Sequence, residues 1–487
     1  MCAFALAWLA LDVARAQTPA SRSATDATPT LAITNVTLID GTGAAPRPGV
    51  TVLVSGTRIS GIVADGAAPH ATAELDGRGK YLIPGLCDGH AHFRHGDRTP
   101  ELFVAHGVTC VRQMFDDMAQ LRTQRSAIAK GQLLGPRMLT IAGGWPDSAG
   151  SREERIADSL VAEGATFFKI GTTLTTASYE AVRRQARRHG VDFLGHLPVS
   201  VSLAEAVISG QRSIEHLALF ELAFAPDESR LRDSLAAAFR RRDAAARDSV
   251  TAAALAGVSE ARRDSLLRLL AARRVWVTPT LVNHRRAAMA GDSAFDVDPR
   301  LRDIPERTRA QWRQSRYRAA RTPEQRALAR ALFAFQEKTV ARMYQLGVPL
   351  IAGSDAGDVY NYDGSSLHDE LRLFVAAGVP TIAALAAATS APVSAAGALD
   401  SLGTVEVGKL ADLVLLDANP LADIGNVGRI SAVVVGGRVI DREEIRQLRE
   451  SGSSRLGQAS DSATARSGLL HGTPLPNSAG AAAEVRK

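Results

Sequence analysis

Between residues 83 and 400, short apolar runs alternate with amphipathic helical patterns eight times. This alternation is typical of βα units, and eight units in one block indicate a closed parallel barrel, the (β/α)8 or TIM-barrel fold. Gly190, Gly210 and Gly347 each come shortly before a run, where the C-cap of a helix belongs. The sequence therefore predicts an α/β protein whose eight barrel strands are LCDGHAH, VTCVRQM, RMLTIAG, TFFKIG, DFLGH, RSIEH, VWVTPTL and PLIAGSD.

The two flanks of this block have a different pattern. Residues 30–82 and 401–445 contain short β-type runs separated by Gly- and Pro-rich turns, which predicts one small β-sandwich formed from both ends of the fold. Within the barrel block, residues 225–272 and 290–345 are rich in Ala and Arg with helical periodicity. We expect two helical insertions there, either beside the barrel mouth or as longer outer helices with no role in substrate choice.

The remaining segments bear on location. Residues 1–16 hold an apolar run and a small-x-small site before Gln17, which predicts a signal peptide, followed by a linker at 17–29 and a periplasmic or secreted protein. No later segment has 18 uninterrupted apolar residues, so no membrane span is expected. Residues 446–487 are polar, which predicts a disordered tail.

Cys87 and Cys110 lie in apolar runs, and we expect buried free thiols rather than a bridge.

The formal net charge of +6 comes from arginines, many of them within residues 230–330. A nucleic-acid site needs a basic patch with interleaved aromatic residues, whereas here aromatics are 5% of the chain and the arginines alternate with acids and alanines. This pattern favours solvated helix faces and a small-molecule substrate. It leaves the oligomeric state open, a homo-oligomer included.

Six residues with metal-binding or proton-transfer chemistry stand at the ends of the apolar runs. Because the carboxyl ends of parallel strands meet at the mouth of a barrel, we expect these side chains to converge. Imidazole and carboxylate are ligands of divalent metals, and the two histidines of HxH point to the same side of one strand. The set consists of His90, His92, Lys169, His196, His216 and Asp355.

Lys169 and Asp355 admit two interpretations each. Lys169 is flanked by Phe167, Phe168 and Ile170, and burial favours the neutral amine, which can add carbon dioxide to form a carbamate. The alternative is a lysine paired with a carboxylate. Asp355 could bind a metal and accept a proton, or it could cap the helix that follows.

These motifs resemble the amidohydrolase superfamily over residues 30–442. IPGLCDGHAH resembles the metal motif of the first strand, and SIEH, GHLP and FFKIG are similar to an imidazolonepropionase-related branch that includes Xaa-Pro and Xaa-Arg metallo-dipeptidases. The resemblance implies two divalent ions, with zinc as the first expectation, although manganese, cobalt and iron accept the same donors. It places His90, His92 and Asp355 on one ion, His196 and His216 on the other, and N6-carboxylated Lys169 between them.

The resemblance also implies hydrolysis of an amide bond, in a peptide or an N-acyl amino acid, by a hydroxide that bridges the metals. Asp355 would take the proton and pass it to the leaving nitrogen. The alternatives are a cyclic-amide hydrolase or deaminase acting on a small ring, and a non-catalytic barrel, which the complete ligand set disfavours. Arg94, Arg112, Tyr360 and His368 are candidates for substrate contacts, although the arginines could equally be structural and His368 could simply open a helix.

Overall fold

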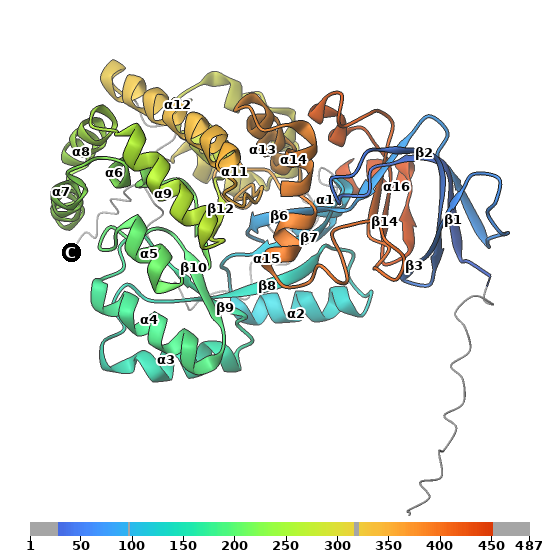
Figure 1. The fold of residues 1–487 in the computed structure, drawn as a ribbon, viewed down its shortest axis with the longest axis horizontal. Coiled ribbons are helices and arrows are strands. Elements are labelled where there is room, and N and C mark those ends of the chain that lie inside the picture. Colours follow the sequence, from blue (N-terminus) through green and yellow to red (C-terminus); the bar gives the residue numbers. More distant parts are fainter. Residues whose placement is uncertain (1–27, 96–97, 316–320, 451–487) are drawn as a thin grey trace, which may run out of the picture.

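The computed structural model describes residues 28–95, 98–315 and 321–450, and Figure 1 shows their arrangement. The predicted signal peptide, residues 17–27 of the predicted linker and residues 451–487 of the predicted tail lie outside these ranges. Two sheets organise the described chain, one in the barrel and one built from both ends of the fold. One cluster of buried aliphatic and aromatic side chains spans the barrel and continues onto the second sheet at Val414 and Val433, and an aliphatic cluster that includes Ile33 and Leu415 forms a second core on that sheet.

The barrel sheet holds seven parallel strands, each paired with the next strand along the chain. They occupy the first seven predicted runs and are β6 (Leu86–Ala91), β7 (Val108–Gln113), β8 (Arg137–Gly144), β9 (Phe167–Ile170), β10 (Asp192–Gly195), β11 (Ser213–Glu215) and β12 (Trp276–Thr278). The eighth run closes the ring through single parallel bridges, Val277 with Leu350 and Ala91 with Ala356. The predicted α/β barrel is therefore confirmed.

Helices connect the strands along the outside of the barrel. The first half carries α1 (Thr99–Ala105), α2 (Met118–Ala129), α3 (Glu153–Ala162), α4 (Thr176–His189) and α5 (Leu203–Ser209). The second half ends with α13 (Ser365–Ala376), α14 (Thr381–Ala387) and α15 (Ser390–Ala395). Gly190 and Gly210 end α4 and α5 in the left-handed conformation, as predicted. Ser202 begins α5 with a capping box to Glu205, so local sequence fixes both ends of this helix.

The two Ala- and Arg-rich stretches are helical. The first contains α7 (Glu228–Arg240), α8 (Ala244–Ala256) and α9 (Glu260–Ala272), and the short α6 (Phe220–Ala223) precedes them. After β12 come α10 (Leu281–Ala288), two 3-10 turns (Ser293–Asp296 and Pro299–Asp303), α11 (Glu306–Arg313) and α12 (Pro323–Gln345). The α8 helix packs against α6, α7 and α12. Figure 1 shows this group at the end of the molecule opposite the second sheet.

The second sheet joins the two flanks of the barrel. Its N-terminal strands are β1 (Leu31–Leu38), β2 (Arg47–Ser55), β3 (Arg58–Ala64), β4 (Ala73–Asp76) and β5 (Tyr81–Pro84). Its C-terminal strands are β13 (Leu413–Leu416), β14 (Ile430–Val435) and β15 (Arg438–Ile440), and β13 pairs antiparallel with β5. The last described helix, α16 (Arg442–Glu450), includes residues 446–450, so the predicted disordered tail is wrong for these five residues.

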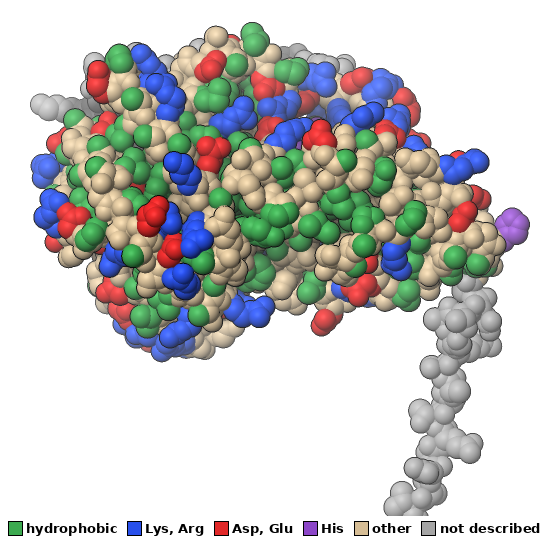
Figure 2. Space-filling view, turned by 45° about the horizontal axis from the view of Figure 1, so that its top comes forward, with side chains coloured by type: hydrophobic (Ala, Val, Ile, Leu, Met, Phe, Trp, Pro, Cys, Tyr) green, Lys and Arg blue, Asp and Glu red, His purple; other side chains and the backbone are tan. Residues whose placement is uncertain are grey.

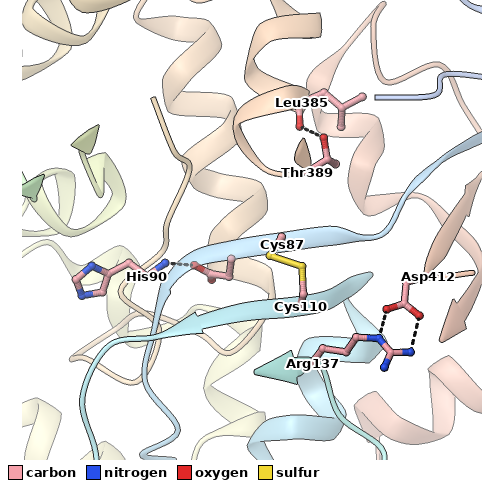
Figure 3. Close-up of a disulfide and its surroundings, with 8 residues drawn as sticks. Cys87, His90, Cys110, Arg137, Leu385, Thr389 and Asp412 are labelled. Carbon is pink, nitrogen blue, oxygen red and sulfur yellow. Dashed lines mark hydrogen bonds and ion pairs between the residues drawn. A yellow bond between two sulfur atoms is a disulfide. The ribbon is translucent and has the colours of Figure 1, made fainter. Parts of the chain in front are cut away.

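The prediction of free thiols was wrong. Cys87 on β6 and Cys110 on β7 form a disulfide, drawn in Figure 3. The two residues are register partners on neighbouring parallel strands, and their Cα atoms are 4.5 Å apart, a separation that a disulfide spans. Both side chains are buried, so the apolar surroundings were predicted correctly and the pairing was not.

The surface agrees with the prediction that the arginines lie on solvated helix faces among acidic side chains. On the face drawn in Figure 2, basic and acidic side chains are interspersed over the helical part of the molecule. Among the described residues, no helix combines the length and the hydropathy needed to cross a membrane.

Candidate metal centre

The six predicted residues converge at the carboxyl ends of the barrel strands. Asp355 Oδ1 lies 3.2 Å from His92 Nε2 and 3.4 Å from His90 Nε2. Lys169 Nζ, on β9, is 3.4 Å from the same His90 nitrogen. The His216 ring is 4.7 Å from that of His90 and 4.8 Å from that of His196, centroid to centroid. The barrel therefore brings together every ligand that the sequence proposed.

Each histidine is oriented by an oxygen that contacts its Nδ1 atom. His90 Nδ1 donates to Glu215 Oε2 at 2.9 Å, and His92 Nδ1 donates to the carbonyl of Phe115 at 2.6 Å. The hydroxyls of Thr172 and Thr280 contact the Nδ1 atoms of His196 and His216, each at 2.7 Å. This leaves the Nε2 atoms available for the centre, which is the arrangement that metal-binding histidines adopt.

The electrostatics favour ligand forms of these groups. Burial lowers the pKa of His90, His196 and His216 below the usual histidine value, which keeps the imidazoles neutral. Burial also lowers the pKa of Lys169 to about 8, so its neutral amine is accessible near neutral pH. Burial raises the pKa of Asp355, but the hydrogen bond with His92 and the neighbouring histidines outweigh it, and the net pKa lies well below the usual range.

The donor set fits divalent ions. His90, His92 and Asp355 offer three ligand atoms that lie within 4.8 Å of one another, all on buried residues. Two imidazoles on neighbouring strands and one buried amine adjoin this group. Nitrogen and carboxylate donors in this number are the ligands that zinc and similar metals use.

Glu215 and Arg112 form a layer behind His90. Arg112 Nη2 donates to Glu215 Oε1 at 3.0 Å, and Ser213 donates to the same oxygen. Arg112 is 2% exposed, so its guanidinium lies inside the barrel, paired with a carboxylate, rather than at the mouth. The sequence reasoning considered Arg112 for substrate binding and overlooked Glu215, although SIEH places that residue directly before a metal histidine.

The other substrate-binding candidates are also engaged within the fold, and Arg94 shares the Phe115 carbonyl with His92. Arg94 Nε donates to Asp116 Oδ1 at 2.9 Å. Tyr360 packs against Phe295 and Trp312, with ring centroids 5.1 and 5.0 Å away. His368, on α13, contacts the carbonyl of His106 at 2.9 Å. These four side chains, Arg112 included, have partners within the fold, and their predicted contact with substrate remains a prediction.

Asn283 is a further functional residue that sequence reasoning missed. Its Nδ2 donates to Asp355 Oδ2 at 2.5 Å and fixes the orientation of that carboxylate.

Glu370 holds the start of α10, because its two oxygens accept from the backbone N–H groups of Leu281 and Val282. Asp355 and His216 themselves have positive φ, at 52° and 64°, a conformation that non-glycine residues adopt where the surrounding structure imposes it.

A cavity of about 370 Å³ reaches the centre at His216, Thr172 and Asn283. Its walls come from α6, α7, α8, α10 and α12, so helices of both Ala- and Arg-rich stretches line it. Apolar side chains alternate with a few charged ones there. The charged side chains that line it are Glu221, Arg247, Asp248 and Arg321.

Comparisons with known proteins agree with this geometry. The profile of the amidohydrolase family matches residues 81–440. An adenine deaminase from Ruegeria pomeroyi is 38% identical over 78 residues, which are 14% of this chain and 12% of that enzyme.

Solved structures share the fold. Bottromycin amidohydrolase superimposes with a TM-score of 0.70 at 24% identity, over 88% of this chain and 90% of that one. A Xaa-Pro dipeptidase with bound methionine gives a TM-score of 0.60 at 20% identity, over 84% and 99%. Phenylurea hydrolase B gives 0.60 at 21% identity, over 85% and 97%.

Proposed function

Because the chain belongs to the amidohydrolase family, we propose that it is a metal-dependent hydrolase that cleaves an amide bond in a peptide or an N-acyl amino acid. The observation that carries the proposal is the convergence of four oriented imidazoles, one buried amine and one carboxylate at the barrel mouth. Bound divalent ions would lower the pKa of water and polarise a carbonyl group.

The ligands divide into two groups. We assign His90, His92 and Asp355 to one ion and His196 and His216 to another, with zinc as the first metal to test. Lys169 stands beside His90, and its lowered pKa supports carboxylation of the amine, which would supply the carboxylate shared by the two ions. The proposal of two ions thus depends on Lys169.

Asp355 is the proposed proton carrier. Its Oδ1 faces the imidazoles, whereas Oδ2 accepts one hydrogen bond from Asn283 and keeps a second acceptor position. The low pKa of this carboxyl keeps it ionised at neutral pH, as a proton acceptor must be. Asp355 would take the proton from the attacking water and deliver it to the leaving nitrogen, while Asn283 holds the carboxylate in place.

Two of the charged side chains in the cavity, Arg247 and Arg321, could bind a substrate that carries a carboxylate. The guanidinium of Arg247 lies 5.2 Å above the ring of Phe239, and both residues line the cavity together with Arg321. A peptide or N-acyl amino acid could place its carboxylate against these cations. The short likeness to an adenine deaminase favours the second candidate function, deamination or opening of a small ring.

A hydrolysis screen of the metal-loaded protein tests the proposal. Dipeptides, N-acyl amino acids, lactams, cyclic ureas and aminopurines are offered in parallel, and release of amine or ammonia is measured. We expect turnover of open-chain amides and its loss in Asp355→Asn, with an exposed substitution such as Glu154→Gln as control. Turnover of ring substrates alone would reject the peptide assignment in favour of the second candidate.

We also propose that the protein works in the periplasm or outside the cell. The support is the buried Cys87–Cys110 disulfide, because such bonds form in oxidising compartments. Fractionation of the native host followed by immunoblotting tests this location, and recovery of the protein solely with cytoplasmic markers would contradict it.

A further inference from the structure

A buried carboxyl group stands in the cavity away from the metal ligands. Glu221, on α6, is 4% exposed and lines the same cavity as His216. Its Oε2 atom is buried and has no hydrogen-bond partner among the described residues. Leaving a buried acceptor unpaired costs free energy, so such a group calls for an explanation.

The charged side chains near Glu221 do not supply a hydrogen-bond donor to its Oε2 atom. Arg232 is the cation whose charge lowers the pKa of this carboxyl, and its guanidinium donates to Glu228 at 2.8 Å and to the carbonyls of Pro198 and Val199 through Nε and Nη1, whereas its buried Nη2 has no hydrogen-bond partner among the described residues. Burial raises the pKa of Glu221 to about 7, which is the response of a carboxyl that lacks a full counter-charge. A ligand that brought a positive N–H group would remove this penalty and stabilise the ionised form.

The rest of the cavity sets the shape of such a ligand. Leucine and alanine side chains together with Phe239 form the apolar part of the cavity wall, which suits an apolar chain or ring. Arg247 and Arg321 are less buried than Glu221 and would repel a cation, and the other acid of the cavity, Asp248, already accepts from Gln325, so a basic group is favoured at Glu221. The apolar wall residues are Leu219, Leu235, Phe239, Leu328 and Leu332.

We propose that this cavity is a substrate subsite for an apolar chain or ring that ends in a basic nitrogen, which Glu221 binds through its free carboxylate oxygen. The subsite rests on the proposed function, because the chain would extend from the amide held at the metal centre. An ionised carboxylate is an acceptor only, and its hydrogen bond with an ammonium or guanidinium group is stronger than one with a neutral donor. Helices α6, α7, α8, α10 and α12 thus select the substrate, and the barrel strands hold the reacting groups.

Two amides of equal length test the subsite. 6-Aminohexanamide ends in an ammonium group, and heptanamide places a methyl group at the same position. Their dissociation constants for the metal-loaded full chain are measured by calorimetry at pH 8, where Glu221 is mostly ionised and the amine is protonated. We expect the wild-type protein to bind the amine at least about tenfold more tightly.

Two variants test whether Glu221 is the residue that causes the preference for the amine. In Glu221→Gln, which keeps the size of the side chain, the two amides should bind with nearly equal affinity. Asp248→Asn makes the same exchange on another wall, at a carboxylate already bound by Gln325 at 3.1 Å, and should keep most of the preference. Equal loss in both variants would indicate a general field effect and would overturn the assignment to Glu221.

Comparing the two amides on the wild-type protein tests the subsite even if Glu221→Gln fails to fold. Heptanamide binding as tightly as 6-aminohexanamide, or neither amide binding, would overturn the subsite. Hydrolysis is not needed to observe the preference. Selective binding combined with a negative hydrolysis screen would therefore reject the proposed function and leave the subsite standing.

Discussion

The orientation of each imidazole depends on a residue that no metal would touch. His90 shows this most clearly, because Glu215 accepts from its Nδ1 and is itself held by Arg112 and Ser213. The pKa of Glu215 lies well below the usual range, since the charge of Arg112 and the bond with His90 outweigh burial. An ionised Glu215 fixes the tautomer of His90 and strengthens its Nε2 as a donor to a metal.

Replacement of this carboxylate should weaken metal binding. In Glu215→Gln the amide cannot satisfy His90, Arg112 and Ser213 together, so we expect a loss of about 10- to 100-fold in metal affinity. The metal retained against a graded series of chelator concentrations measures the effect. Glu154→Gln, at a side chain 70% exposed, is the matched control. Retention equal to that of the wild type would show that Glu215 does not position the ligand.

Lys169 should give a pH dependence of a particular sign. Carbon dioxide adds to the neutral amine only, and burial lowers the pKa of Lys169 from 10.5 to about 8. Between pH 7 and pH 9 the neutral fraction rises about tenfold. We therefore expect metal-stripped protein to regain metal faster over this range at constant dissolved carbon dioxide, with little change above it.

The lysine variant separates carboxylation from other pH effects. Lys169→Ala should bind less metal and lose activity together, and its metal uptake should not respond to carbon dioxide. Unchanged metal stoichiometry in this variant would exclude the bridging role. A wild-type uptake rate that does not depend on carbon dioxide would exclude the carbamate.

At the scale of elements, β6 and β7 are joined covalently directly beneath the metal histidines. Figure 3 shows the Cys87–Cys110 bond with His90 further along the same strand. The bond closes a loop with a sequence separation of 23, and loops of this length give disulfides worth about 3 kcal/mol. We expect Cys87→Ala/Cys110→Ala to lower the urea midpoint accordingly. A midpoint shared with the wild type would show that strand packing alone holds β6 against β7.

Much of this element order could be predicted from the sequence. Seven of the eight apolar runs became paired strands, and the eighth, PLIAGSD, lies between β12 and β6 with single bridges. Strand ends in a parallel barrel share one rim, which is why His90 and Asp355 could be brought together without any knowledge of contacts. Periodicity also located the helices of residues 225–272 and 290–345.

Contacts that depend on register or on packing could not be predicted. Cys87 and Cys110 bond because β6 and β7 align them, and register between parallel strands is not written in either run. Glu221 and Arg247 lie near His216 only after α6, α7 and α8 fold over the barrel. Arg112 has the charge of a substrate anchor, yet the barrel interior pairs it with Glu215.

The whole molecule divides its tasks between its two ends. On one side of the metal centre, the second sheet is tied to the barrel by Arg137 of β8, whose guanidinium binds Asp412 with N–O distances of 2.6 and 3.3 Å (Figure 3). On the other side lie the helices α6, α7, α8, α10 and α12, whose side chains line the cavity. The ligands themselves come from β6, β9 and the ends of β10, β11 and the eighth run, so bound ions would link these strands across the barrel mouth.

Metal removal should therefore destabilise the entire barrel. An ion that binds only the folded chain adds stability by mass action, about 4 kcal/mol at a thousandfold excess over its dissociation constant. We expect chelator-treated protein to melt at a lower temperature and stoichiometric zinc to restore the wild-type value. If two ions bind, the recovery needs two equivalents in the wild type, and Lys169→Ala recovers only part of it. Identical melting temperatures with and without metal would contradict the assignment of these strand-end residues as ligands, because a metal bound only by the folded chain must raise its stability.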